Sequence, residues 1–232
     1  MTAKQRSYVE VVYNETDRPL TDYPNKLARY LFGRYRIRPG DTLLDIGCGR
    51  GEFLRGFIEC GAKGFGVDQT DAAKKYCPSA ELRLANLENE PLPYGDDTFD
   101  VVYSKSVVEH FYYPEKLVRE MYRVLKPGGL VITLCPDWEF NIRNYFEDFT
   151  HRTPFTVTSL HDILVMNGFD RVTVERFRQL PVLWTGIGRV LMPIAEMTRL
   201  LAPRALKPVS KWVRFSKEIM LLSSARKPTS SS

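Results

Sequence analysis

Three side chains in the middle of the chain have the chemistry of a general base. His110 ends the run Ser-Val-Val-Glu-His at residues 106–110, and Asp148 and His151 lie in a stretch rich in aromatic and charged residues. A histidine titrates near neutral pH and can accept a hydroxyl proton, and a carboxylate can orient that hydroxyl or deprotonate it. We take His110, His151 and Asp148 as candidate catalytic residues. A structural hydrogen bond is an equally good interpretation of each histidine.

A glycine-rich turn earlier in the chain is suited to hold a ligand. Residues 42–46 form a short apolar run typical of a buried strand, and glycine follows at positions 47, 49 and 51. A backbone without Cβ atoms can approach a ligand closely. Dinucleotide-binding turns require glycine at the position that Glu52 occupies here, which argues against a pyrophosphate ligand. A sharp corner between a strand and a helix, without a ligand, is the alternative.

Asp68 closes the next predicted strand, which reads Gly-Phe-Gly-Val-Asp at residues 64–68. An acidic residue at this point can accept hydrogen bonds from both hydroxyls of a ribose. The alternative is that Asp68 caps a helix over residues 69–76. We favour ribose binding because the strand, the position and the preceding glycine turn agree.

These residues form part of a wider pattern that resembles a known family. The order Asp-x-Gly-x-Gly-x-Gly at residues 45–51 resembles the first motif of class I S-adenosylmethionine-dependent methyltransferases, of the small-molecule kind called type 11 or type 23. Phe-Asp-Val-Val at residues 99–102 resembles the second motif, the segment carrying His110 resembles the one that follows it, and Leu-Lys-Pro-Gly-Gly at residues 125–129 is typical of the family. The four motifs stand in the family's order.

The resemblance implies S-adenosylmethionine as the cofactor and identifies the residues that contact it. Asn86 and Leu87 occupy the place of the adenine contacts, with Asn86 where the family more often has Asp, and Ser104 lies where the methionine tail and the transferable methyl are held. The cofactor site implied in this way comprises Asp45, Gly47, Cys48, Gly49, Gly51, Asp68, Gln69, Asn86, Leu87 and Ser104.

The elements that must position these residues define the fold class. We expect a Rossmann-like, doubly wound α/β domain with a seven-stranded, mostly parallel sheet, an antiparallel last strand and a helical insert before it. The expected division is an N-terminal helical cap at residues 1–38, a cofactor-binding core at 39–178, a basic amphipathic insert at 179–215, and the last strand and tail at 216–232.

The insert carries most of the positive charge. Nine basic and two acidic residues follow residue 178, a net charge of +7, so the first 178 residues carry −2. A basic segment with Trp and Leu, such as residues 180–214, can lie in a membrane interface or close over an apolar acceptor. Packing against the sheet with a solvated basic face is the alternative. Pro181, Arg189 and Pro193 argue against a membrane-spanning helix.

The remaining composition predicts no metal site and no export. The four cysteines lie far apart without a zinc-binding spacing, which favours reduced thiols. The first residues lack the apolar core of a signal peptide, so we expect a cytoplasmic protein, with attachment to the inner face of the membrane left open.

The expected activity is O-methylation of a small-molecule, sugar or lipid-linked acceptor. The phrase at residues 148–155, Asp-x-Thr-His-x-x-Pro-Phe, resembles a subgroup found in glycan and lipid-linked saccharide modification. A nucleic-acid methyltransferase is disfavoured, because the segment after the fourth strand lacks an Asn/Asp-Pro-Pro-Tyr signature. A non-catalytic scaffold that binds the cofactor is the second alternative. The sequence does not decide the oligomeric state.

Overall fold

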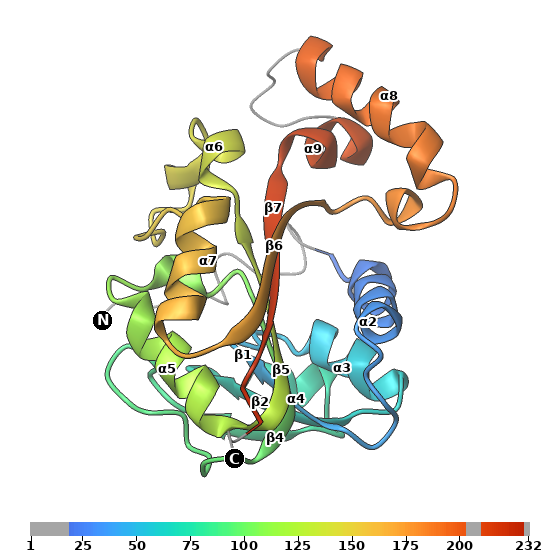
Figure 1. Ribbon diagram of the computed structural model, residues 1–232. Coiled ribbons are helices and arrows are strands. Elements are labelled where there is room, and N and C mark those ends of the chain that lie inside the picture. Colours follow the sequence, from blue (N-terminus) through green and yellow to red (C-terminus); the bar gives the residue numbers. More distant parts are fainter. Residues whose placement is uncertain (1–18, 203–209, 230–232) are drawn as a thin grey trace, which may run out of the picture.

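Seven strands form one sheet in the order β3-β2-β1-β4-β5-β7-β6 (Figure 1). The computed structural model describes residues 19–202 and 210–229, so parts of the predicted cap, insert and tail lie outside the described residues. The strands are β1 (Thr42–Ile46), β2 (Lys63–Asp68), β3 (Glu81–Leu84), β4 (Phe99–Lys105), β5 (Leu125–Pro136), β6 (Asp170–Arg178) and β7 (Ile219–Arg226). β1 to β5 pair in parallel and β7 is antiparallel to both of its neighbours, which confirms the predicted fold class.

Helices cover both faces of the sheet. One face carries α2 (Tyr23–Arg34) and α3 (Glu52–Glu59), and the other carries α5 (Pro114–Val124) and α7 (Val157–Met166), as Figure 1 shows. The spacing of Leu117, Met121 and Val124 predicts an amphipathic helix over residues 114–125, and in α5 these side chains lie on one side and are buried. The parallel strands therefore end between two covered faces, where a ligand can be enclosed.

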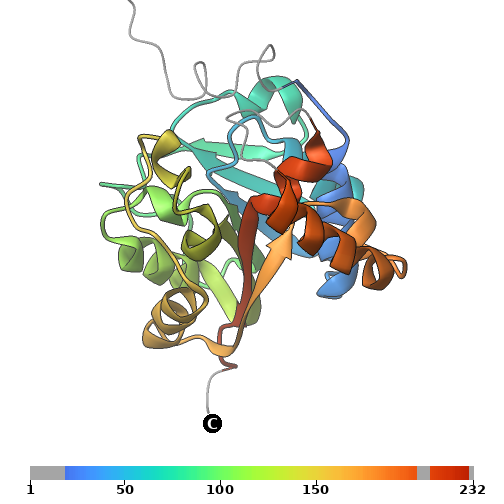
Figure 2. The ribbon, with the colours of Figure 1, turned by 90° about the horizontal axis from the view of Figure 1, so that it is seen from above.

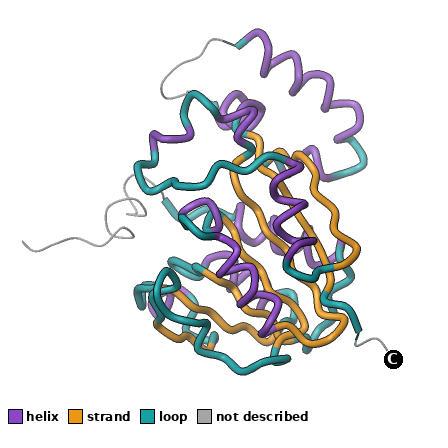
Figure 3. The backbone as a smooth tube through the Cα atoms, turned by 60° about the vertical axis from the view of Figure 1, so that its left-hand side comes forward, coloured by secondary structure: helices purple, strands orange, loops and turns teal. Residues whose placement is uncertain are grey.

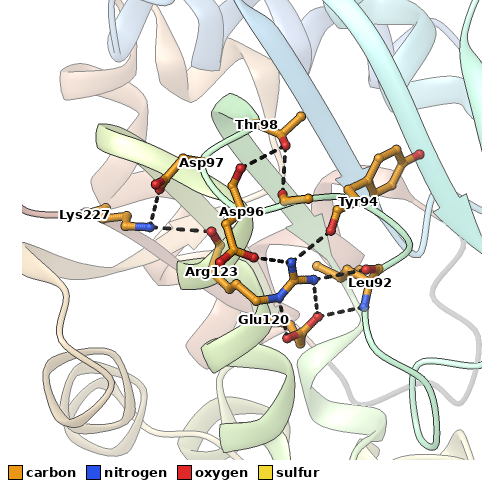
Figure 4. A network of polar contacts seen from close by, with 9 residues as sticks. Leu92, Tyr94, Asp96, Asp97, Thr98, Glu120, Arg123 and Lys227 are labelled. Atoms are coloured by element: carbon orange, nitrogen blue, oxygen red, sulfur yellow. Dashed lines mark hydrogen bonds and ion pairs between the residues drawn. The ribbon is translucent and has the colours of Figure 1, made fainter.

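Arg123 of α5 holds the loop that leads into β4. Its guanidinium donates to the carbonyls of Leu92 (3.0 Å) and Tyr94 (2.9 Å) and to the carboxylates of Asp96 (2.8 Å) and Glu120 (2.6 Å) (Figure 4). Glu120 also accepts a hydrogen bond from the backbone N–H of Leu92 at 2.8 Å. This network satisfies the polar groups of an irregular loop and fixes the start of β4, whose other end lies at the predicted site.

The insert lies between β6 and β7 and contains η3 (Pro181–Trp184), α8 (Gly188–Leu201) and α9 (Lys211–Lys217). Because β6 runs parallel to β5, the insert leaves the sheet at the edge where the parallel strands end, and it stands off from the body in Figure 3. Trp184 anchors it, with its ring stacked on Tyr30 at 5.0 Å and on Phe177 at 5.3 Å between centroids. No helix in the described ranges is both long and apolar enough to span a bilayer.

The connection after β5 lies at the same edge of the sheet. It contains α6 (Trp138–Asn141) and η2 (Tyr145–Glu147), drawn in yellow in Figure 2 on the opposite side of β7 from α8. Arg199 of α8 reaches across to Phe140, with its guanidinium carbon 5.2 Å from the ring centroid. These two segments therefore flank the ends of the central strands.

Candidate active site

The glycine turn after β1 has the backbone conformation that glycine permits. Gly47 and Gly49 have φ of +68° and +53°, a region that other residues adopt at a cost. A Cβ atom on Gly47 would lie 2.4 Å from Cγ2 of Val107, whereas a Cβ on Gly49 would have nothing within 4 Å. Gly47 is therefore required by packing, and Gly49 borders open space that a ligand can enter.

Asp68 at the end of β2 is tied to this turn. Its Oδ2 accepts a hydrogen bond from the backbone N–H of Gly49 at 2.9 Å, and its Oδ1 accepts from the N–H (3.0 Å) and hydroxyl (3.2 Å) of Thr70. The helix that follows, α4 (Ala73–Tyr76), has Ala72 at its N-cap, so the alternative that Asp68 caps this helix is wrong. A carboxylate offers about four acceptor positions, so Asp68 keeps capacity for a ligand hydroxyl.

Asp45 and Ser104 lie on the paired strands β1 and β4, where Asp45 is in register with Tyr103 and Ser104 with Ile46. Asp45 is buried, and burial, followed by the nearby charge of Asp68, raises the pKa of its carboxyl well above the usual range. Ser104 is buried too, and its hydroxyl has no hydrogen-bond partner among residues 19–202 and 210–229. Unpaired buried polar atoms are costly, and a ligand that forms a hydrogen bond with the Ser104 hydroxyl would remove this cost. Ser104 is the residue predicted to lie beside the methionine tail of S-adenosylmethionine.

The predicted adenine contacts lie at the ends of β2 and β3. Gln69 donates weakly to Oδ1 of Asn86 at 3.5 Å, and the same oxygen accepts from the backbone N–H of Glu88 at 3.2 Å. Asn86 is exposed and Leu87 is half-buried. This burial is compatible with a polar contact from Asn86 to the adenine amino group and an apolar contact from Leu87 to the ring. The thiol of Cys48 is buried, and burial raises its pKa.

A strained turn at the end of β4 joins the cofactor side to the rest of the site. Ser106 has φ of +56°, and residues other than glycine adopt this conformation where the surroundings impose it. The turn places Val107 against Gly47 and starts the short helix η1 (Val108–His110). His110 therefore lies three positions along the chain from Val107, whose side chain lies beside Gly47.

The three candidate catalytic residues lie in one hydrogen-bonded cluster. Nδ1 of His110 lies 2.9 Å from the hydroxyl of Thr150, which donates to Oδ1 of Asp148 at 2.5 Å. Nδ1 of His151 lies 2.6 Å from the carbonyl oxygen of Tyr145, and the two imidazole centroids are 4.9 Å apart. Burial and then the charge of His151 lower the pKa of His110 below its ordinary value. The structure thus brings together His110 and Thr150, which lie 40 positions apart in the sequence.

Glu109 belongs to the same cluster and was not among the residues predicted from the sequence. Its side chain is fully buried, and within the described part of the chain neither carboxylate oxygen has a hydrogen-bond partner. Burial raises the pKa of this carboxyl to about 8. Its backbone carbonyl accepts from Arg152 (2.8 Å) and Thr153 (3.1 Å), which holds the loop carrying His151 against η1. The available signal was an acidic residue directly after the apolar pair Val107 and Val108.

Comparison with known proteins identifies the region that carries the cofactor residues. Residues 44–133 match a family model described as a methyltransferase domain. Residues 44–133 therefore carry a methyltransferase domain. The match includes Asp45, Asp68, Ser104 and His110 and ends before the loop with Asp148 and His151.

A curated relative named as a methyltransferase shares part of its sequence with this chain. An uncharacterized methyltransferase of Mycobacterium tuberculosis is 37% identical over 103 residues, which cover 43% of this chain and 41% of that protein. The chain therefore spans about two fifths of the length of the curated relatives it matches.

Solved structures share the fold of the methyltransferase domain over a longer range. An S-adenosylmethionine-dependent methyltransferase from Archaeoglobus fulgidus has a TM-score of 0.66 at 23% identity and covers 95% of this chain and 100% of its own. The Haemonchus contortus phosphoethanolamine N-methyltransferase 2, solved with phosphomonomethylethanolamine and S-adenosylhomocysteine, has a TM-score of 0.63 at 21% identity over 88% of this chain and 52% of its own. At these identities the likeness establishes the fold.

Proposed function

We propose that this methyltransferase domain is catalytic and O-methylates a hydroxyl of a small-molecule, sugar or lipid-linked acceptor. The observation that carries the proposal is the position of the His110 and His151 pair, one short turn beyond the strand that ends at Ser104 and Lys105. In this arrangement an acceptor oxygen can lie between the histidines and the cofactor methyl. Holding both reactants in this way supplies much of the acceleration of a methyl transfer.

The cofactor would be held by the residues at the ends of β1, β2 and β4. Asp68 would accept the ribose hydroxyls, Asn86 and Leu87 would meet the adenine, and Asp45 and Ser104 would face the methionine end. S-adenosylmethionine supplies an electrophilic methyl group on a sulfonium. Ser106 fixes the path of the chain from this site to the histidines.

Each histidine would accept the hydroxyl proton at Nε2. Thr150 donates its only hydroxyl hydrogen to Asp148, so it accepts from Nδ1–H of His110. The carbonyl of Tyr145 can only accept, so Nδ1 of His151 is protonated as well. Both rings therefore carry their lone pair on Nε2, and Asp148 acts through Thr150 as a positioning residue.

Exposed aromatic rings around this cluster suit an acceptor with an apolar or saccharide face. Tyr112 is exposed two residues after His110, and Phe149 is exposed beside Thr150. The guanidinium of Arg152 lies 5.1 Å from the Tyr112 ring centroid and brings a positive charge to this rim. An acceptor with an anionic group beside its hydroxyl would be favoured by this charge.

The insert supports attachment to a membrane that carries such an acceptor. Exposed apolar side chains recur along α8 at helical spacing, at Val190, Ile194, Met197 and Leu201. The other side of α8 packs on α9 through Ala195, so this row is presented outward. An amphipathic helix with basic neighbours binds anionic lipid surfaces through such a row. We propose that α8 places the domain at the membrane surface.

The acceptor class is tested by methyl transfer from radiolabelled S-adenosylmethionine to fractionated cell material. The proposal predicts label in the lipid or saccharide fraction, stable to mild alkali as an ether, and a 14-dalton increase in the product. Label in RNA or DNA would support the nucleic-acid alternative. Cofactor binding with no labelled product in any fraction would support the scaffold alternative and contradict the proposal.

A further inference from the structure

Glu109 is the side chain in this site that the methyl transfer proposed above leaves without a task. A fully buried carboxyl group with no hydrogen-bond partner for either oxygen in the described residues is costly to ionise, because burial removes its solvation. Glu109, His110 and His151 each offer a ligand atom, and these atoms lie within 4.8 Å of one another. A cation bound between them would compensate the buried carboxylate.

We propose that Glu109, His110 and His151 form a binding site for one divalent transition-metal ion. The orientation of the histidines is an independent observation in favour of a metal. Each ring is fixed through Nδ1, by the Thr150 hydroxyl in one case and the Tyr145 carbonyl in the other, which leaves the lone pair on Nε2. Metal-binding histidines are held in this way by a partner of the second nitrogen. The Thr150–Asp148 pair extends that support for His110.

The donor set selects among the divalent ions. Two imidazole nitrogens and one carboxylate oxygen suit Zn²⁺, and also Fe²⁺ or Mn²⁺, whereas Mg²⁺ and Ca²⁺ prefer oxygen ligands throughout. Three protein ligands leave at least one coordination position open. Zn²⁺ is therefore the best first probe of the site.

This inference rests on the proposed function for its catalytic meaning. An acceptor hydroxyl in the open position would be held beside the cofactor methyl, and coordination lowers the pKa of a bound hydroxyl. With the ion bound, the two Nε2 atoms are metal ligands. The histidines then hold the ion in place of accepting the hydroxyl proton, which leaves to solvent. The hydroxyl oxygen then forms the bond to the methyl carbon as the sulfur–carbon bond breaks. Binding of the ion can be measured without this reaction.

The test is metal binding to the full chain after treatment with a chelator. We expect one Zn²⁺ per chain by equilibrium dialysis and elemental analysis, and binding weakened at least about tenfold in Glu109→Gln and in His151→Gln. A further readout uses Co²⁺, whose visible spectrum should show nitrogen and oxygen ligands without a thiolate band. His161→Gln is the matched control, because His161 is an exposed histidine of α7 beside Asp162.

Each outcome decides the inference. Undiminished Zn²⁺ binding in both variants, a thiolate band with Co²⁺, or no binding to the parent chain would overturn it. Circular dichroism establishes that each variant is folded, and the two substitutions provide independent tests if one of them is not. Methyl transfer that persists in chelator, with no metal bound, would refute the catalytic role of the ion and leave the proposed function standing. Metal binding without methyl transfer would support the metal site and contradict the proposed function.

Discussion

The backbone N–H of Gly49 donates to Oδ2 of Asp68 at 2.9 Å, so the carboxylate that ends β2 is tied to the turn that follows β1. Gly49 follows β1 and Asp68 ends β2, and these two strands are parallel neighbours. The hydrogen bond therefore holds the turn beside the carboxylate predicted to bind the ribose. A change at either residue should therefore alter cofactor binding more than it alters the rest of the fold.

The two glycines of the turn should respond differently to alanine. Both have positive φ, so each substitution should cost about 1 to 2 kcal/mol of stability through backbone strain. Gly47→Ala should cost more, because its Cβ would collide with Val107. Gly49→Ala should mainly weaken S-adenosylhomocysteine binding. Thermal unfolding and calorimetry separate the two effects, and equal melting temperatures with equal affinities would contradict this account of the turn.

The Thr150 hydroxyl should matter for turnover and leave cofactor binding unchanged. Thr150→Val keeps the shape of the side chain and removes the contacts with His110 and Asp148. We expect kcat to fall about tenfold or more, since an unsupported imidazole is free to rotate and to change tautomer. Affinity for S-adenosylhomocysteine should match that of the parent chain. Unchanged kcat would show that the cluster does not orient the histidine for catalysis.

Membrane attachment should depend on the outward row of α8. The double substitution Ile194→Asp and Met197→Asp places two charges in that row, so co-sedimentation with anionic phospholipid vesicles should fall strongly. Met166→Asp in α7 is the matched control, because Met166 is another exposed apolar side chain. Loss of binding in the control, or retention in the double variant, would argue against the role of α8.

The Glu120–Arg123 pair should make stability sensitive to acid. The hydrogen bond from Arg123 lowers the pKa of Glu120 below its ordinary value of 4.5. Because the folded-state pKa is the lower one, the stabilisation is present above pH 4.5 and is lost as the pH falls through the folded-state value. Both side chains are partly exposed, so the contribution is about 1 kcal/mol. Urea titrations at pH 7 and at acid pH should show a smaller pH effect in Glu120→Gln, and an equal effect would contradict this.

The parts of the fold and site that could be predicted are those that depend on the residue pattern of a short stretch of sequence. Apolar strands that end in Asp45-x-Gly47 and in Asp68 reveal both the strand and the edge at which its carboxylate lies. Because all parallel strands end at one edge of the sheet, the cofactor residues could be gathered without knowing the strand order. The amphipathic helix at residues 114–124 followed from its own spacing in the same way.

The contacts that could not be predicted join residues far apart in the sequence. The pairing of His110 with Thr150 depends on how an irregular loop folds back on η1, and that loop is held by the backbone of Glu109. The spacing of apolar and polar residues in the sequence does not predict such a contact. Glu109 itself looked like an ordinary charged residue, and its significance comes from burial that the surrounding loop produces.

The most direct test of the account is calorimetric titration of S-adenosylhomocysteine into the parent chain, Asp68→Asn and the control Asp71→Asn. Asp71 is an exposed carboxylate three residues away that pairs with Lys74. We predict binding by the parent and the control, and an affinity about tenfold to a hundredfold lower for Asp68→Asn, the cost of losing hydrogen bonds to a charged acceptor. No heat from the parent, or equal affinity in all three proteins, would contradict the claim that the cofactor lies between Asp68 and the glycine turn.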